Sequence, residues 1–97
     1  MIKVSVTDKK ITIAGHAGYD EYGRDIVCAS ASSIAITTIN AILSFDSEAI
    51  NYEEKKDELI INVLKKDEIT NKLLNNMISL FKELASQYKE NIKVIGG

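Results

Sequence analysis

Two kinds of hydrophobic spacing follow one another twice along this chain, and their order limits the possible folds more than any other feature of the sequence. Near the start, Ile2, Val4 and Val6 alternate with polar residues as in a half-buried strand, and a second strand is expected at 11–14. Residues 15–24 show no periodicity and are predicted to form a loop. Three- and four-residue steps then predict a helix whose buried stripe is Val27, Ala31, Ile34, Ala35, Thr38 and Ile42.

The second half of the chain repeats this arrangement. Residues 47–54 and 58–64 are expected to form a hairpin, and the later strand is apolar at both alternating sets of positions, as in a strand covered on both faces. Asp67 and Glu68 then open a second helix at the end that favours negative charge. A last short strand is expected at 92–95. The predicted buried stripe of the second helix is Ile69, Leu73, Met77, Leu80, Phe81, Leu84 and Tyr88.

The element order is therefore β-β-α-β-β-α-β. The simplest architecture for it is an α+β fold, a two-layer sandwich with two helices packed on a mostly antiparallel sheet. With 97 residues, the chain 1–97 is expected to form a single domain. Ile36, Ile39 and Leu43 widen the apolar stripe of the first helix, so this helix is either deeply buried or offers a second face to another chain.

Composition excludes several classes of function. A net charge of -2 and a pI near 5.3 disfavour general binding to nucleic acid or to an anionic membrane. One Cys and one His cannot supply a disulfide or the usual zinc ligands, and no cofactor or metal is expected. The start MIKVSV lacks the pattern of a signal peptide, and no continuous apolar run reaches the roughly 18–20 residues of a membrane span. We expect a reduced, cytoplasmic protein with no membrane partner.

The only His and the only Cys lie close together in the sequence. Cys28 falls in the first turn of the predicted helix, where the partial positive charge favours a thiolate. His16 follows the second strand and could take the thiol proton, while the free N–H groups of the helix end could receive an oxyanion. From spacing alone, the favoured interpretation of Cys28 is an inert core residue, and His16 is as readily explained as a loop or capping residue.

A two-part motif surrounds these residues. Gly15-His16-Ala17 is followed by YGRDIVCASAS at residues 22–32, and the pair closely resembles the G-H-A and G-x-D-I-V-C-A-x-x-S elements of the bacterial ribosomal-processing cysteine proteases. The length and element order agree over the whole chain. Arg24 stands where Lys is frequent in the family, and this leaves the exact peptide preference open.

This resemblance implies a specific activity. Members of the family are endopeptidases that remove a short N-terminal extension from the precursor of large-subunit ribosomal protein twenty-seven, cutting after an aromatic residue. The resemblance assigns Cys28 as the nucleophile and His16 as the general base of a dyad that forms a thioester. It also implies a two-layer α/β sandwich and a homodimer.

Four further residues are candidates for the site. Asp25 matches a family position and could orient His16, but its place before the helix makes an N-cap the favoured interpretation. Ser32 lies one turn beyond Cys28 and could contact the thiol or the substrate. Tyr19 and Tyr22 could cover a cleft over Cys28. Acidic residues beside these tyrosines, Asp20 and Glu21, could attract basic residues after the cut.

Two other classes of function remain for comparison. In the first, the chain is a non-catalytic homodimeric adaptor that binds a ribosomal protein or an assembly factor, with Cys28 merely buried. In the second, it is an RNA-binding module, which the acidic balance and the lack of a basic stripe with aromatic residues disfavour.

Overall fold

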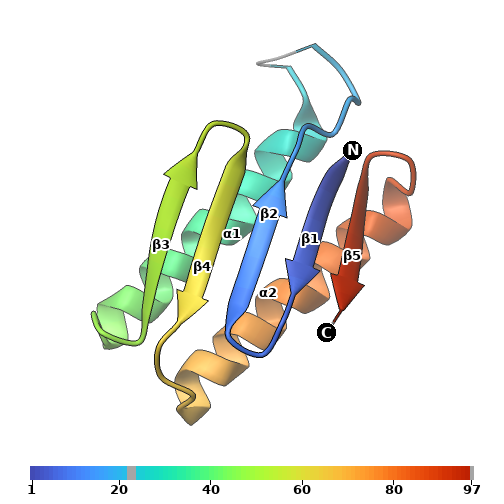
Figure 1. Cartoon of the computed structure of the whole chain (residues 1–97). Coiled ribbons are helices and arrows are strands. Elements are labelled where there is room, and N and C mark those ends of the chain that lie inside the picture. The colour runs from blue at the N-terminus through green and yellow to red at the C-terminus, as the bar shows by residue number, and fades with distance from the viewer. Residues whose placement is uncertain (22–23, 97) are drawn as a thin grey trace.

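The computed structural model describes residues 1–21 and 24–96. The elements of these residues follow the predicted order (Figure 1). They are β1 (Ile2–Val6), β2 (Lys10–Ala14), α1 (Ile26–Phe45), β3 (Ile50–Lys55), β4 (Glu58–Val63), α2 (Glu68–Gln87) and β5 (Ile92–Gly96).

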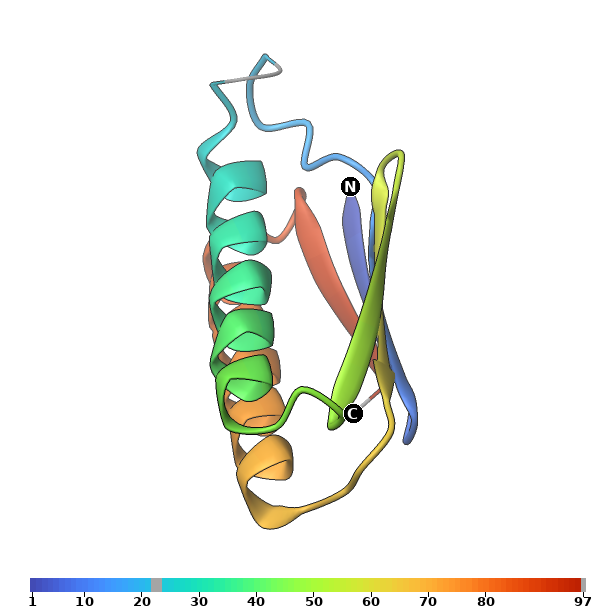
Figure 2. The same ribbon diagram turned by 90° about the vertical axis from the view of Figure 1, so that its left-hand side faces the viewer.

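One five-stranded sheet forms the first layer, in the order β3-β4-β2-β1-β5. All neighbouring strands are antiparallel except β1 and β5, which run parallel with Ile2 opposite Ile92. Both helices pack on the same face of this sheet and form the second layer (Figure 2). The predicted α+β sandwich, with two helices on a mostly antiparallel sheet, is therefore confirmed.

The core lies between the two layers, and α1 contributes much of it. Its buried residues are Val27, Ala31, Ala35, Thr38, Ile39 and Ile42. The predicted stripe is nearly right, with Ile34 only half-buried. Ile39 belongs to this stripe at 1% exposure, whereas Ile36 points outward at 37%. The second apolar face suggested by the sequence is thus narrower than expected.

The buried stripe of α2 differs from the prediction. Ile69 is 48% exposed and Leu80 is 39% exposed, so two of the expected core positions face outward. The fully buried positions are Thr70, Leu74, Met77 and Phe81. The prediction was wrong there because it left out Thr70 and Leu74, which are both buried. The observed stripe shares Met77 and Phe81 with the predicted one and turns toward Thr70 and Leu74.

The strand β4 is covered on both faces near its middle, as expected from its sequence. Ile61 faces the helices and is fully buried, while Ile60 points to the opposite face and is also buried. Ile60 lies between Thr12 of β2 and Glu53 of β3, its partners in the ladder. Ile60 is thus buried on the side of the sheet that carries no helix, and Figure 2 shows that both helices lie on the other side.

The helix α1 is long and apolar enough to cross a membrane by length and composition alone. This is weak evidence, because the core helix of a soluble protein can pass the same test. One third of its most apolar window is buried inside the fold.

The rotated stripe of α2 can be tested by comparing adjacent residues. Phe81→Ala is expected to lower the free energy of unfolding by about 3–5 kcal/mol, because it leaves a cavity at a fully buried position. Leu80→Ala should change it by less than about 1 kcal/mol. Urea unfolding of the two variants measures both values. Equal losses would place Leu80 in the core and contradict the packing described here.

Candidate active site

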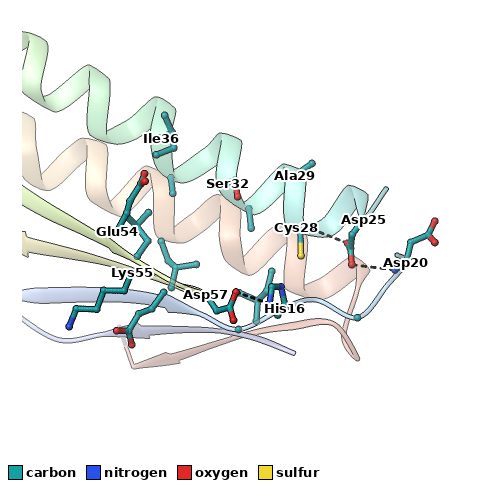
Figure 3. Close-up of a pocket in the computed structure, with 18 residues that line it drawn as sticks. His16, Asp20, Asp25, Cys28, Ala29, Ser32, Ile36, Glu54, Lys55 and Asp57 are labelled. Atoms are coloured by element: carbon teal, nitrogen blue, oxygen red, sulfur yellow. Dashed lines mark hydrogen bonds and ion pairs between the residues drawn. The ribbon is translucent and has the colours of Figure 1, made fainter. Parts of the chain in front are cut away.

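A cleft of about 720 Å³ opens between the first turns of α1 and the sheet. The end of β2 and the turn between β3 and β4 form the wall opposite α1 (Figure 3). Ile13, Leu59 and Ile36 give the cleft an apolar lining, and His16 and Cys28 both belong to it. Residues of the sequence motif therefore line this cleft.

His16 is positioned by the end of β2 and by the β3–β4 turn. Gly15 has a φ of +96°, and a side chain at this position would meet the Met1 carbonyl oxygen at 2.5 Å, so only glycine fits. Its N–H donates to the Asp57 carbonyl at 2.8 Å. The Asp57 carboxylate lies 2.8 Å from His16 Nε2, with the two side chains 44% and 55% exposed. The Asp57 carboxylate thus contacts the Nε2 nitrogen, one of the two nitrogens of the imidazole ring.

The thiol of Cys28 is half-buried at the first turn of α1. The N–H of Ala17 donates to its sulfur at 3.3 Å, so the residue directly after His16 touches the thiol. Figure 3 shows the imidazole of His16 and the thiol of Cys28 at the same end of the cleft, with Asp57 on the far side of the imidazole. The structure therefore brings together the two residues that the motif singled out.

Asp25 caps α1 and also holds the preceding loop. One carboxylate oxygen accepts from the N–H groups of Val27 and Cys28, and the other accepts from those of Tyr19 and Asp20. Burial acts to raise the pKa of this carboxyl, but the four N–H donors outweigh it and the pKa lies below its ordinary value. Four donors fill the usual capacity of a carboxylate. Asp57 is the carboxylate that contacts His16.

Some of the helix N–H groups that the sequence analysis expected to receive an oxyanion already have acceptors. The N–H groups of Val27 and Cys28 are taken by the Asp25 side chain, and that of Ala29 is taken by the Asp25 carbonyl. Because a capping aspartate was itself predicted here, these donors could have been assigned to it from the sequence. The backbone N–H at the sulfur comes instead from the loop, at Ala17.

The other candidate residues take different positions. Ser32 is exposed and lines the cleft beyond Cys28. The ring of Tyr19 packs edge-on against the ring of Tyr88, with 5.3 Å between the ring centroids. Tyr19 is not among the residues that line the cleft. Asp20 lines the cleft, whereas Tyr22 lies outside the residues that the structure describes. Across residues 1–21 and 24–96, no group of three or more His, Cys, Asp or Glu side chains could hold a metal ion.

Two residues of the site were not found by the sequence analysis. Asp57 comes from the hairpin turn, and Asn91 comes from the turn after α2, where its amide donates to the Ala17 carbonyl at 3.0 Å. Asp57 could have drawn attention because it ends the polar turn between the two expected strands. Nothing in the sequence around Asn91 signals its contact, because the partner is 74 residues away.

This arrangement suits acyl transfer. A thiol and an imidazole line the same cleft, a carboxylate contacts the imidazole, and a backbone N–H donates to the sulfur. A thiolate is a strong nucleophile toward a carbonyl carbon, and an imidazole can shuttle the proton. The apolar cleft beside the thiol provides room for a peptide side chain.

Comparison with known proteins agrees with this chemistry. The family described as cysteine protease Prp matches residues 1–93. The ribosomal processing cysteine protease Prp of Staphylococcus aureus strain Mu50 is 34% identical, with 97% of each chain covered. That of Mycoplasma pneumoniae is 39% identical over 56% of this chain and 51% of its own.

Solved structures show the same relationship. The essential ribosomal processing protease Prp from Staphylococcus aureus, in complex with a covalently linked product peptide, superposes with a TM-score of 0.87 and 27% identity, covering 97% of this chain and 95% of that one. The same protease with a substrate peptide gives a TM-score of 0.79 and 26% identity, covering 96% and 94%. The fold, the coincidence of motif and cleft, and these matches together show that the chain belongs to the Prp family of ribosomal processing cysteine proteases.

Proposed function

We propose that Cys28 is the nucleophile of this protease and that His16 is its general base and acid. The contact between the Ala17 N–H and the Cys28 sulfur carries this proposal, because it places the residue after His16 against the thiol. Asp57 supports it by holding the opposite nitrogen of the ring, as the third member of a catalytic triad does. Asp25 serves as the helix cap and loop clamp.

In the proposed reaction, His16 takes the thiol proton and the sulfur attacks the carbonyl carbon of the scissile peptide bond. The C–N bond then breaks, and His16 returns the proton to the leaving amine while the acyl group stays on the sulfur as a thioester. Water, deprotonated by His16, attacks the thioester carbonyl and releases the carboxylic acid and the thiol. Atoms and protons balance over the two steps, and no cofactor takes part.

The proposed substrate is the precursor of large-subunit ribosomal protein twenty-seven, cut after an aromatic residue in the cytoplasm. The relatives support it, since they are named as ribosomal processing proteases and one is solved with a substrate peptide. The apolar lining of the cleft suits an aromatic side chain. Its carboxylates outnumber its one lysine, Lys55, and would attract basic residues near the cut. The cleft carboxylates are Asp20, Asp25, Glu54, Asp57 and Glu58.

The proposed cleavage can be tested with the precursor from the same organism. Wild-type protein is expected to make a single N-terminal cut, read by mass spectrometry, and Cys28→Ala should make none because only the sulfur is removed. The variant should still bind the precursor. A precursor that binds the wild type and stays uncut would favour the adaptor function instead, and a precursor that does not bind would remove it as the substrate.

The role of His16 can be tested without a substrate. Since Cys28 is the only cysteine, iodoacetamide modification reports on this thiol alone. His16→Ala should slow this modification and lower kcat by about 10²–10⁴-fold, with a smaller change in KM. Lys56→Ala, in the exposed β3–β4 turn, is the matched control and should leave both rates unchanged. Equal rates in the wild type and His16→Ala would remove His16 from the mechanism.

We also propose that the protein is a homodimer, with the exposed apolar residues of α1 in the interface. Ile36 stands 37% exposed on this helix and is available for a contact with a second copy. Ile36→Glu is therefore expected to shift a dimer toward the monomer in light scattering. Ile39 is unsuitable for this test because it lies in the core, and a charge there would unfold the chain. An unchanged mass would move the interface to another surface.

A further inference from the structure

The turn between α2 and β5 lies against the loop that follows His16, although the two segments are far apart in the sequence. The Asn91 side-chain amide donates to the Ala17 carbonyl at 3.0 Å. The ring of Tyr88, at the end of α2, packs edge-on against the ring of Tyr19, with 5.3 Å between the ring centroids. Two separate contacts thus connect this turn to the loop.

Asn91 is itself held firmly by the sheet. Its carbonyl accepts from the N–H of Ile2 at 2.9 Å, at the point where β1 and β5 begin to pair. Its own N–H donates to the Tyr88 carbonyl at 2.9 Å. Both main-chain groups are therefore fixed by rigid elements, and the side chain projects from a defined position.

Ala17 connects Asn91 to the thiol. Its carbonyl accepts from Asn91, its N–H donates to the Cys28 sulfur at 3.3 Å, and its methyl group is buried in the core at 2% exposure. The peptide groups on both sides of its Cα are thus held by hydrogen bonds. Releasing the carbonyl would free the residue to rotate and carry its N–H away from the sulfur.

We propose that Asn91 is a positioning residue of the protease site, which acts through Ala17 to aim a backbone N–H at the Cys28 sulfur. This rests on the proposed role of Cys28 as the nucleophile. A hydrogen bond to an ionised acceptor is stronger than one to a neutral acceptor, so this N–H stabilises the sulfur most when the sulfur carries negative charge. That charge is needed before the sulfur can attack a carbonyl carbon.

A purely structural role predicts something different. If Asn91 only ties the α2–β5 turn to the loop, its loss lowers the free energy of unfolding and leaves the reactivity of the folded protein unchanged. The reactivity of Cys28 in the folded protein therefore separates the two roles, and it needs no knowledge of the substrate.

The main test is Asn91→Leu, which keeps the approximate size of the side chain and removes its donor without adding charge. The rate of Cys28 modification by iodoacetamide at one neutral pH is expected to fall about three- to tenfold, as for the loss of one hydrogen bond to a charged group. With a cleavable peptide, kcat should fall by a similar factor while KM stays within about twofold. Should this variant fail to fold, Asn91→Ala removes the same donor with a smaller side chain.

Two comparison variants make the result specific. Asn71→Leu removes a matching hydrogen bond, from a side-chain amide to the Lys66 carbonyl at 3.3 Å, at the opposite end of α2. It should leave the modification rate and kcat unchanged. Asn91→His places an N–H donor where the amide was and should restore much of the lost rate.

A second measurement follows the Ala17 N–H directly. Amide hydrogen exchange of Ala17, observed by NMR in the folded protein, should be faster in Asn91→Leu than in the wild type or in Asn71→Leu. Unchanged exchange would show that Asn91 does not hold this residue and would overturn the proposal.

The possible failures are distinguishable. A folded Asn91→Leu variant that keeps the wild-type modification rate and kcat overturns the role of Asn91, whatever the substrate is. If the wild type does not cut the precursor but Asn91→Leu still slows the modification of Cys28, the substrate is wrong and the role of Asn91 stands. If wild-type Cys28 reacts no faster than an ordinary thiol, the nucleophile assignment fails and the role of Asn91 fails with it.

Discussion

The carboxylate of Asp25 is the interaction on which the site depends. It joins the first turn of α1 to the loop after His16, because one oxygen binds helix N–H groups and the other binds loop N–H groups. Among residues 1–21 and 24–96, the hydrogen bond to the Cys28 sulfur and the surrounding apolar contacts also connect the helix to the loop that carries Ala17. The pKa of the Asp25 carboxyl lies below its ordinary value, so it is ionised across the neutral range and keeps these hydrogen bonds there.

The other contacts of the site come from distant parts of the chain. The β3–β4 turn supplies Asp57 to one side of His16, and the α2–β5 turn supplies Asn91 to the carbonyl of Ala17. Both turns lie at the same end of the sandwich as the start of α1, because β2 and β3 run toward this end and β5 runs away from it, as Figure 1 shows. The fold thus gathers three loops and one helix end around a single thiol.

The sequence predicts the fold class well and the site in part. Periodicity identified all the described elements in order, because each strand or helix buries one side against the same core. It misplaced the stripe of α2 because it left out the polar Thr70 and also Leu74, which are both buried. The motif singled out Cys28 and His16, and the structure places both in one cleft. Asp57 and Asn91 could not be found in this way, since their contacts depend on how the sheet and helices pack.

The capping of α1 also separates two properties that a helix end usually combines. A helix N-terminus offers both a fixed position and free N–H groups for an anion. Here Asp25 occupies the N–H groups of Val27 and Cys28, so these two groups fix the start of the helix instead of binding an anion. The donor at the sulfur belongs instead to Ala17, in the loop that borders the cleft. A change that loosens this loop must therefore alter the hydrogen bond to the sulfur and the access of a peptide to the cleft together. This is a physical reason for the loop to be held at both ends, by Asp25 and by Asn91.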